Sequence, residues 1–233
     1  MAAPVPVLMV PGLACSPRLY AAQMPAIWQA SGPVTVANHT TADTLSGIAA
    51  SILAHAPPRF HLVGLSMGGY ISLEIVRQAP GRIAKLALLD TTARPDLPEQ
   101  TERRRKLIAL AEEDKLTAIN DLLWPLLVHE SHQNDQTLRA TIDAMMTETG
   151  APAFIRQQHA IISRPDSRPF LPSVRAQTVV IVGDSDKITT PAMNEEIASG
   201  VPGARLEIVR ESGHMTTLEQ PAVVTKLLVD WFG

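Results

Sequence analysis

The 233-residue chain contains one cysteine, Cys15. A single cysteine cannot form an internal disulfide, and a chain with one cysteine lacks the cysteine clusters that bind zinc or iron–sulfur centres. Charged residues are also few, at 18%, and the net charge is -3, which gives no sign of the basic surface that binds nucleic acid. The expected partner is therefore a small molecule, and no metal or organic cofactor is implied.

Long hydrophobic runs are missing as well. No apolar stretch approaches the ~18 residues that a membrane-spanning helix needs. Residues 1–6 show no basic segment leading into an apolar one, as a secretory signal would. These absences predict a cytoplasmic protein without membrane attachment. A chain of this length is expected to form one α/β domain, with room for an inserted subdomain.

What the chain does contain is a strand, a sharp turn and a helix around Ser66. The apolar run 60–65 predicts a buried strand, and residues 71–76 have helical spacing. Between them, Gly64 and Gly68 lie two residues on either side of Ser66, as a strained turn requires. A small-x-Ser-x-small pentapeptide also occurs in ordinary glycine-rich loops, but the flanking strand and helix favour Ser66 as a nucleophile.

Further apolar runs alternate with helical patterns along the chain. Strands are predicted at 5–10, 34–37, 60–65, 83–90, 178–183 and, as an edge strand, 205–210. Helices are predicted at 17–30, 44–55, 66–79 and 220–232, with another beginning near 191. Such alternation predicts a mostly parallel sheet of about six strands with helices on both faces. Ligands of such sheets bind at the carboxyl ends of the strands.

The pattern changes in the middle of the chain, where no strand is predicted. Four helices are expected there, at 98–113, 115–130, 134–150 and 151–163, with a kink or break at Pro125. We therefore predict a core formed by 1–92 and 174–233, and a helical lid formed by 93–173. The lid's basic run, 103–106, is more typical of a solvated helix face than of a ligand site, yet it is the feature best suited to an anionic substrate or carrier.

A serine nucleophile needs a base, and the base needs an acid that orients it. Among seven histidines, His214 follows the last strand in a loop at the carboxyl end of the sheet and is the predicted base. His39 lies at the same end but after an earlier strand. Asp186, Asp184 and Asp90 each follow a strand. Asp186 has the best position for the acid, Asp184 is a candidate for bracing the loop, and Asp90 is an alternative acid.

The chain order Ser66, Asp186, His214 resembles that of the α/β-hydrolase family. Members commonly have a Gly-x-x-Asp pattern after one late strand and a Gly-His pair after the next, which residues 183–186 and 213–214 match. The resemblance covers the chain outside the lid. It implies an α/β-hydrolase fold and selects Asp186 as the acid of a Ser-His-Asp triad.

The resemblance also implies an oxyanion hole formed by the backbone N–H groups of Leu13 and Met67. Two departures from the family pattern stand out. The His-Gly pair usual in the early loop is Pro11-Gly12 here, and there is no room before Val5 for the family's first two strands. Neither departure removes a catalytic group. With this lid, the chain resembles small esterases of the pimeloyl-carrier-protein methyl ester type and enol-lactone hydrolases.

The resemblance implies a serine hydrolase that cleaves a carboxylic ester, thioester or lactone of a small to medium acyl group through an acyl-enzyme. The substrate is a small molecule, free or carrier-bound, and the protein is expected to be a monomer or homodimer. Pocket walls are expected from Trp124, Leu127, Met146 and Phe154. The same triad also serves C–C hydrolases, lyases, synthases and haloperoxidases, and the scaffold occurs in non-catalytic binding proteins; these alternatives stay open.

Overall fold

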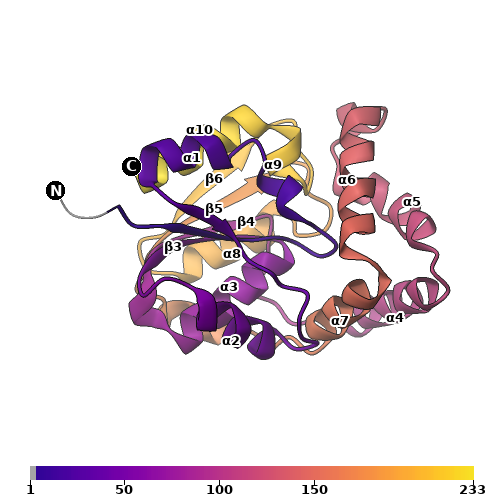
Figure 1. Cartoon of the computed structure of the whole chain (residues 1–233), viewed down its shortest axis with the longest axis horizontal. Helices are drawn as coiled ribbons and strands as arrows, with labels where there is room; N and C mark the ends of the chain where they lie inside the picture. The colour runs from indigo at the N-terminus through magenta and orange to yellow at the C-terminus, as the bar shows by residue number, and fades with distance from the viewer. Residues whose placement is uncertain (1–3) are drawn as a thin grey trace.

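The computed structural model describes residues 4–233 and is built on one sheet of six strands in the order β2-β1-β3-β4-β5-β6 (Figure 1). The strands are β1 Val7–Val10, β2 Val34–Val36, β3 Phe60–Leu65, β4 Ile83–Leu89, β5 Gln177–Gly183 and β6 Arg205–Val209. All neighbouring strands are parallel. The predicted α/β class and parallel sheet of about six strands are confirmed.

Burial along the strands follows their positions in the sheet. Every residue of β3, in the middle, is buried, whereas in β6, at the edge, only Val209 is buried and the four residues before it are partly or fully exposed. A parallel sheet is covered on both faces, so its inner strands are continuously apolar. Because all six strands run in the same direction, their carboxyl ends lie at the same end of the sheet.

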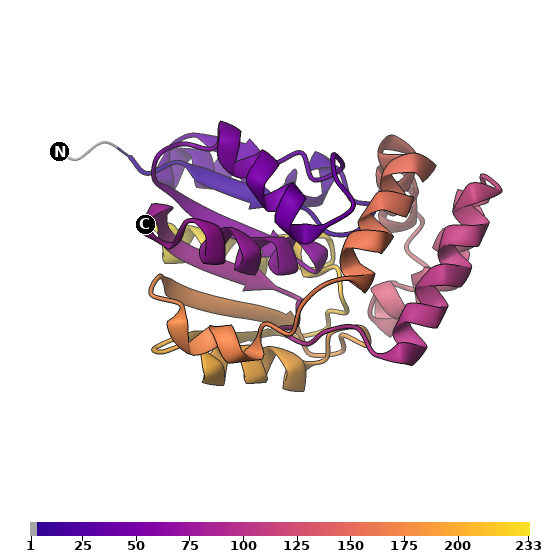
Figure 2. The same cartoon turned by 90° about the horizontal axis from the view of Figure 1, so that it is seen from below.

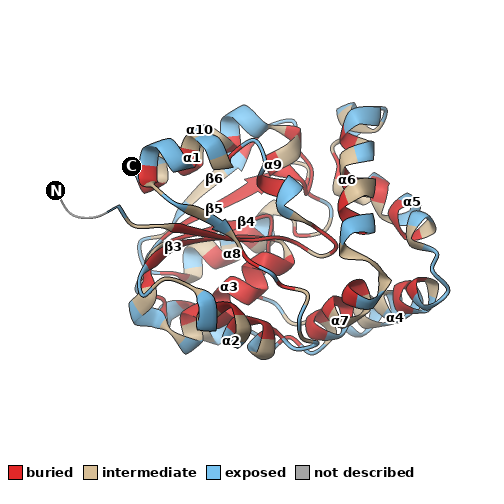
Figure 3. Ribbon diagram, viewed as in Figure 1, coloured by how far each residue is buried: buried red, intermediate tan, exposed pale blue. Residues whose placement is uncertain are grey.

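Helices cover both faces of the sheet, and the buried strands lie between them (Figure 3). On one face lie α1 Met24–Ser31, the short α9 Thr216–Glu219 and α10 Pro221–Phe232; on the other lie α2 Leu45–His55, α3 Met67–Gln78 and α8 Pro191–Gly200. Two hydrophobic clusters fill the interfaces, one on each side of the sheet. The expected helices on both faces are thus present.

The helix predicted at 17–30 was wrong in its extent. The structure has a 3₁₀ turn, Pro17–Tyr20, and then α1 beginning at Met24. Pro25 lies in the first turn of α1, where its missing N–H costs nothing, but the same proline would break a helix continuing from residue 17. The Tyr20 hydroxyl donates to the Val10 carbonyl at 2.9 Å, which fixes the 3₁₀ turn against the end of β1.

Four helices follow β4 before the chain returns to the sheet at β5. They are α4 Pro98–Glu112, α5 Leu116–Leu127, α6 Gln136–Thr149 and α7 Ala151–Ile162. Together they lie beyond the carboxyl ends of the strands (Figure 2). Pro125 lies inside the last turn of α5, which ends two residues later. We call α4–α7 the lid helices; the division into core and lid domains stays a prediction. Among residues 4–233, no helix is long and apolar enough to cross a membrane.

Candidate active site

Ser66 occupies a sharp turn between β3 and α3, at φ 55° and ψ -117°. A residue with a side chain is strained in this region, at a cost of roughly 1–3 kcal/mol. Two hydrogen bonds, one with β4 and one with the loop that follows it, hold it there. The Ser66 N–H donates to the Leu89 carbonyl at 2.9 Å, and the Thr91 hydroxyl donates to the Ser66 carbonyl at 2.8 Å. The turn leaves the Ser66 hydroxyl partly accessible at the end of the sheet.

The glycines on either side of Ser66 are needed because the backbones of three elements touch here. A Cβ at Gly64 would lie 2.2 Å from the Gly68 carbonyl oxygen, and a Cβ at Gly68 would lie 2.0 Å from the Val10 carbonyl oxygen. No side chain fits at either distance. The glycines therefore let α3 begin directly against β3 and β1, which sets the position of Ser66.

Replacing Gly68→Ala should lower the free energy of unfolding by about 1–3 kcal/mol, because β1 and α3 must separate to admit the methyl group. Denaturant unfolding measures this change. Gly81→Ala is the matched control, since a Cβ there would meet nothing within 4 Å. Equal stability of the two variants would contradict the close contact of β1 and α3.

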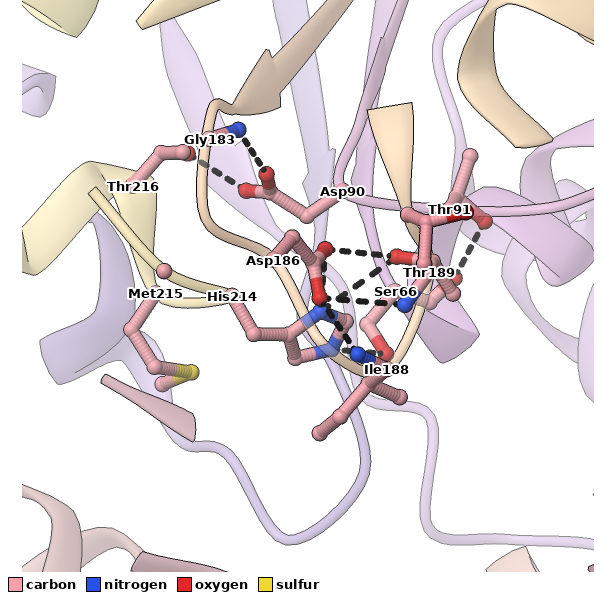
Figure 4. A network of polar contacts seen from close by, with 12 residues as sticks. Ser66, Asp90, Thr91, Gly183, Asp186, Ile188, Thr189, His214, Met215 and Thr216 are labelled. Atoms are coloured by element: carbon pink, nitrogen blue, oxygen red, sulfur yellow. Dashed lines mark hydrogen bonds and ion pairs between the residues drawn. The ribbon is translucent and has the colours of Figure 1, made fainter. Parts of the chain in front are cut away.

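His214 links Ser66 to Asp186 (Figure 4). Its Nε2 lies 2.9 Å from the Ser66 Oγ, and its Nδ1 lies 2.8 Å from Oδ2 of Asp186. Both His214 and Asp186 are 3% exposed. The three residues come from the turn after β3, the loop after β5 and the loop after β6, so the structure brings together the three residues that the sequence singles out.

Asp186 is held by its own loop. Its Oδ1 accepts hydrogen bonds from the N–H groups of Ile188 at 2.8 Å and Thr189 at 3.0 Å, and its Oδ2 accepts one from the Thr189 hydroxyl at 2.8 Å. Burial raises the pKa of Asp186, but the charge and hydrogen bond of His214 and the two hydrogen bonds from Thr189 outweigh burial and bring the pKa below its usual value. An ionised Asp186 keeps the proton on Nδ1 of His214 and leaves Nε2 free to accept one.

Within residues 4–233, the other two acids considered from the sequence form no hydrogen bond with His214. Asp184 accepts hydrogen bonds from the N–H groups of Glu211 at 3.1 Å and Ser212 at 3.3 Å. It therefore braces the loop that carries His214, which is the role the sequence offered as its alternative.

Asp90 lies fully buried behind the triad and joins its two loops (Figure 4). It accepts a hydrogen bond from the Gly183 N–H at 3.0 Å and another from the Thr216 hydroxyl. Burial, reinforced by the charge of Asp186, raises the pKa of Asp90 well above its usual value. The geometry thus gives Asp90 a positioning task between the acid's loop and the histidine's loop.

The loop of His214 is also fastened to the end of α5. The His214 N–H donates to the Leu127 carbonyl at 2.9 Å. Glu219 accepts hydrogen bonds from the N–H groups on either side of His214, at 2.9 and 3.1 Å, and from the His129 N–H at 2.6 Å. Sequence reasoning missed Glu219, because no local pattern shows that its carboxylate turns back to cap this loop.

The loop after β1 lies against Ser66 and carries Leu13. Within residues 4–233, the N–H groups of Leu13 and Met67 donate no hydrogen bond to another protein atom. The peptides beside Leu13 are fixed: His39 Nε2 lies 2.8 Å from the Gly12 carbonyl oxygen, and the Ala14 N–H donates to Gln157 at 3.0 Å. Two unpaired N–H groups near a serine hydroxyl are the arrangement that stabilises an oxyanion.

His39 therefore takes the place of the bracing histidine that the early loop lacks. Burial lowers its pKa to about 4, so near neutral pH the imidazole is uncharged and its Nε2–H donates to the Gly12 carbonyl. From the sequence, His39 is a competing base that is set aside in favour of His214 and expected to be a packing or surface residue. Its position after β2, the strand beside β1, is the signal that could have placed it against this loop.

A cavity of about 390 Å³ lies between Ser66, His214 and the lid helices. Leu127 and Met146 line it, as expected. Trp124 and Phe154 do not, and that prediction was wrong: Phe154 is fully buried among the lid helices, and the Trp124 ring turns away, with its N–H bonded to the Gln133 carbonyl. Helical spacing identifies the buried face of a lid helix but not which part of that face borders a cavity.

The cavity wall also includes a thiol. Cys15 lines the cavity, but burial raises the pKa of the thiol to about 12, which keeps it protonated and makes it a poor second nucleophile. In the part of the chain that the structure describes, no three His, Cys, Asp or Glu side chains gather as metal ligands would.

The pH dependence should report His214, which must be neutral to accept the Ser66 proton. Burial lowers its pKa, but the charge and hydrogen bond of Asp186 outweigh this and raise the pKa above 6.5. We therefore expect kcat/KM to fall as the pH drops through a value above 6.5. His39 and His61, with pKa values lowered to about 4, cannot produce that limb. A limb below 6.5 in the pH profile would contradict the proposed base.

The parallel sheet, the strained serine turn and the histidine loop after the last strand define a protein of the α/β-hydrolase class. Residues 10–221 match the family model described as the alpha/beta hydrolase fold. The chain therefore belongs to the alpha/beta hydrolase family.

Solved structures resemble it over nearly its whole length. A thermophilic esterase from Thermogutta terrifontis is 28% identical, with a TM-score of 0.86, and the match covers 97% of this chain and 89% of that one. The enol-lactonase from Burkholderia xenovorans LB400 is 23% identical, with a TM-score of 0.86 over 99% and 92%. At that identity the second likeness concerns the fold alone.

Among curated proteins, the 2-hydroxy-6-oxononadienedioate/2-hydroxy-6-oxononatrienedioate hydrolase of Escherichia coli K12 is 25% identical over 178 residues. The match covers 74% of this chain and 62% of that protein. The chain thus spans less than two thirds of the length of this relative.

Proposed function

We propose that the protein is a serine hydrolase that cleaves a carboxylic ester, thioester or lactone of a small to medium acyl group. The observation that carries the proposal is the hydrogen-bonded chain from Ser66 through His214 to Asp186, next to the unpaired N–H groups of Leu13 and Met67. The similarity to the Thermogutta esterase supports ester chemistry.

In this mechanism, His214 Nε2 removes the Ser66 proton as Ser66 Oγ attacks the carbonyl carbon. The oxyanion accepts hydrogen bonds from Leu13 and Met67, and Asp186 stabilises the imidazolium. As the tetrahedral intermediate collapses, His214 returns the proton to the leaving alcohol. Water then attacks the acyl-enzyme with His214 again as base, which releases the acid and restores the serine.

A second candidate function is hydrolysis of a C–C bond. The curated relatives are named for substrates with two carboxylates, a hydroxyl and a ketone but no ester group. Hydrolysis of such a molecule must break a C–C bond, and Ser66 and His214 would then act on a ketone carbonyl. Because this relative is longer than the chain and only 25% identical to it, we place C–C hydrolysis second to ester hydrolysis.

Hydrolysis of p-nitrophenyl esters from acetate to decanoate tests the proposal, with Ser66→Ala as the control. We expect turnover that depends on Ser66, with a best chain length set by the cavity of about 390 Å³. Absence of turnover on every ester, together with cleavage of a 2-hydroxy-6-oxo-dienoate, would replace the proposal by the second candidate.

A further inference from the structure

One arginine of the basic run on α4 does not lie on a solvated face. Arg103, Arg105 and Lys106 are exposed, as the sequence favoured, but the Arg104 side chain is only 18% exposed. Arg104 lines the same cavity as Ser66 and His214. Exposure to water explains a charged side chain on the outer face of a helix. It does not explain a mostly buried guanidinium beside the candidate active site.

The surroundings of Arg104 leave positive charge in place. Its Nε lies 3.2 Å from both carboxylate oxygens of Asp96, and its Nη1 donates to Gln158 at 3.0 Å. Asp96 is shared with Arg164, whose Nη1 lies 2.7 Å from it, and the side chains of both are at most 4% exposed. Two guanidiniums thus share one carboxylate, and Arg104 Nη2 donates to no other residue in 4–233.

Other side chains of the cavity wall add to the positive charge of Arg104. The wall's other charged side chains, besides His214, are Arg103 and Lys187, which are cationic, and Glu99, the one acidic residue among those that line the cavity. Most of the remaining wall is apolar. The apolar side chains that α4, α5 and α6 contribute include Leu107, Leu123, Leu127, Ile142, Met145 and Met146. Such a wall suits a methylene chain, and the guanidinium suits an anion at its end.

We propose that the cavity binds an acyl chain that ends in a free carboxylate, with Arg104 as the residue that binds it. The substrate would then be a monoester or lactone of a dicarboxylic acid, bound with its scissile carbonyl at Ser66. This inference rests on the proposed hydrolase function. The Asp96 carboxylate and Gln158 hold the guanidinium by its Nε and Nη1, which orients Nη2 for the ligand without a loss of side-chain freedom on binding.

The test compares monomethyl esters of succinate through suberate with methyl alkanoates of the same chain length. Wild-type protein should prefer one of the carboxylate esters in kcat/KM. Arg104→Gln should lower that preference by about 10- to 100-fold, mainly through KM, because a charge-assisted hydrogen bond is lost. Arg104→Lys keeps the charge but not the planar fork and should lie between the two. Arg105→Gln removes the same charge from the exposed side of α4 and should leave the preference intact.

Absence of a carboxylate preference in the wild type would overturn the inference while leaving the proposed function standing. So would an unchanged preference in a folded Arg104→Gln variant. If no ester is turned over, calorimetric titration of adipate into Ser66→Ala, with and without Arg104→Gln, tests the site by itself: binding that needs Arg104 supports it, and equal or absent binding overturns it.

Discussion

Ser66→Ala should lose turnover by a factor on the order of 10⁴ to 10⁶ while keeping the fold. The hydroxyl is the nucleophile in the proposed mechanism, and water in the same cavity cannot replace it. Among residues 4–233 the Ser66 side chain bonds only to His214, whereas its backbone bonds to Leu89 and Thr91 remain in the variant. Initial rates on the best ester measure the loss.

The control for this variant is its thermal unfolding temperature, which should match that of the wild type. A folded Ser66→Ala protein with more than a tenth of the activity would show that another group attacks the ester. Cys15 would be the next candidate in the cavity, although its raised pKa argues against it.

Asp186→Asn should lower kcat by about 10³- to 10⁴-fold, because the amide favours the wrong tautomer of His214 and cannot stabilise its charge. Asp90→Asn is the matched variant. Its amide oxygen can still accept from the Gly183 N–H, and its neutral side chain resembles a carboxyl whose pKa is already raised. We therefore expect it to cost less than about tenfold in kcat.

The comparison of these two variants identifies the acid. If Asp90→Asn were the more damaging change and Asp186→Asn nearly silent, Asp90 would be the residue that supports His214. Both variants keep the shape of the side chain, so denaturant unfolding should show folded proteins in each case.

Much of the fold could be predicted because it depends on local composition. The strands were visible as continuous apolar runs, since a sheet covered on both faces needs no alternation. The turn at Ser66 was visible because backbone contacts at Gly64 and Gly68 exclude every side chain. The helix at 17–30 failed because the sequence pattern does not show the hydrogen bond from Tyr20 to β1.

The candidate site was predictable only in part, for a similar reason. Ser66 and His214 follow strands in recognisable loops, and the resemblance to a known family selected Asp186. His39, Glu219 and Asp90, which support these residues, join segments far apart in the sequence. No periodicity encodes such contacts. The basic run shows a different limit: two of its four residues, Arg103 and Arg104, line the cavity, and composition could not identify them.

The most direct test of the central claim is reaction of the wild-type protein with a fluorophosphonate probe, followed by peptide mass spectrometry. The probe forms a stable analogue of the tetrahedral intermediate on an activated serine. We expect one adduct, on the peptide that contains Ser66, and none in Ser66→Ala. Turnover of esters by a protein that carries no adduct at Ser66 would contradict it.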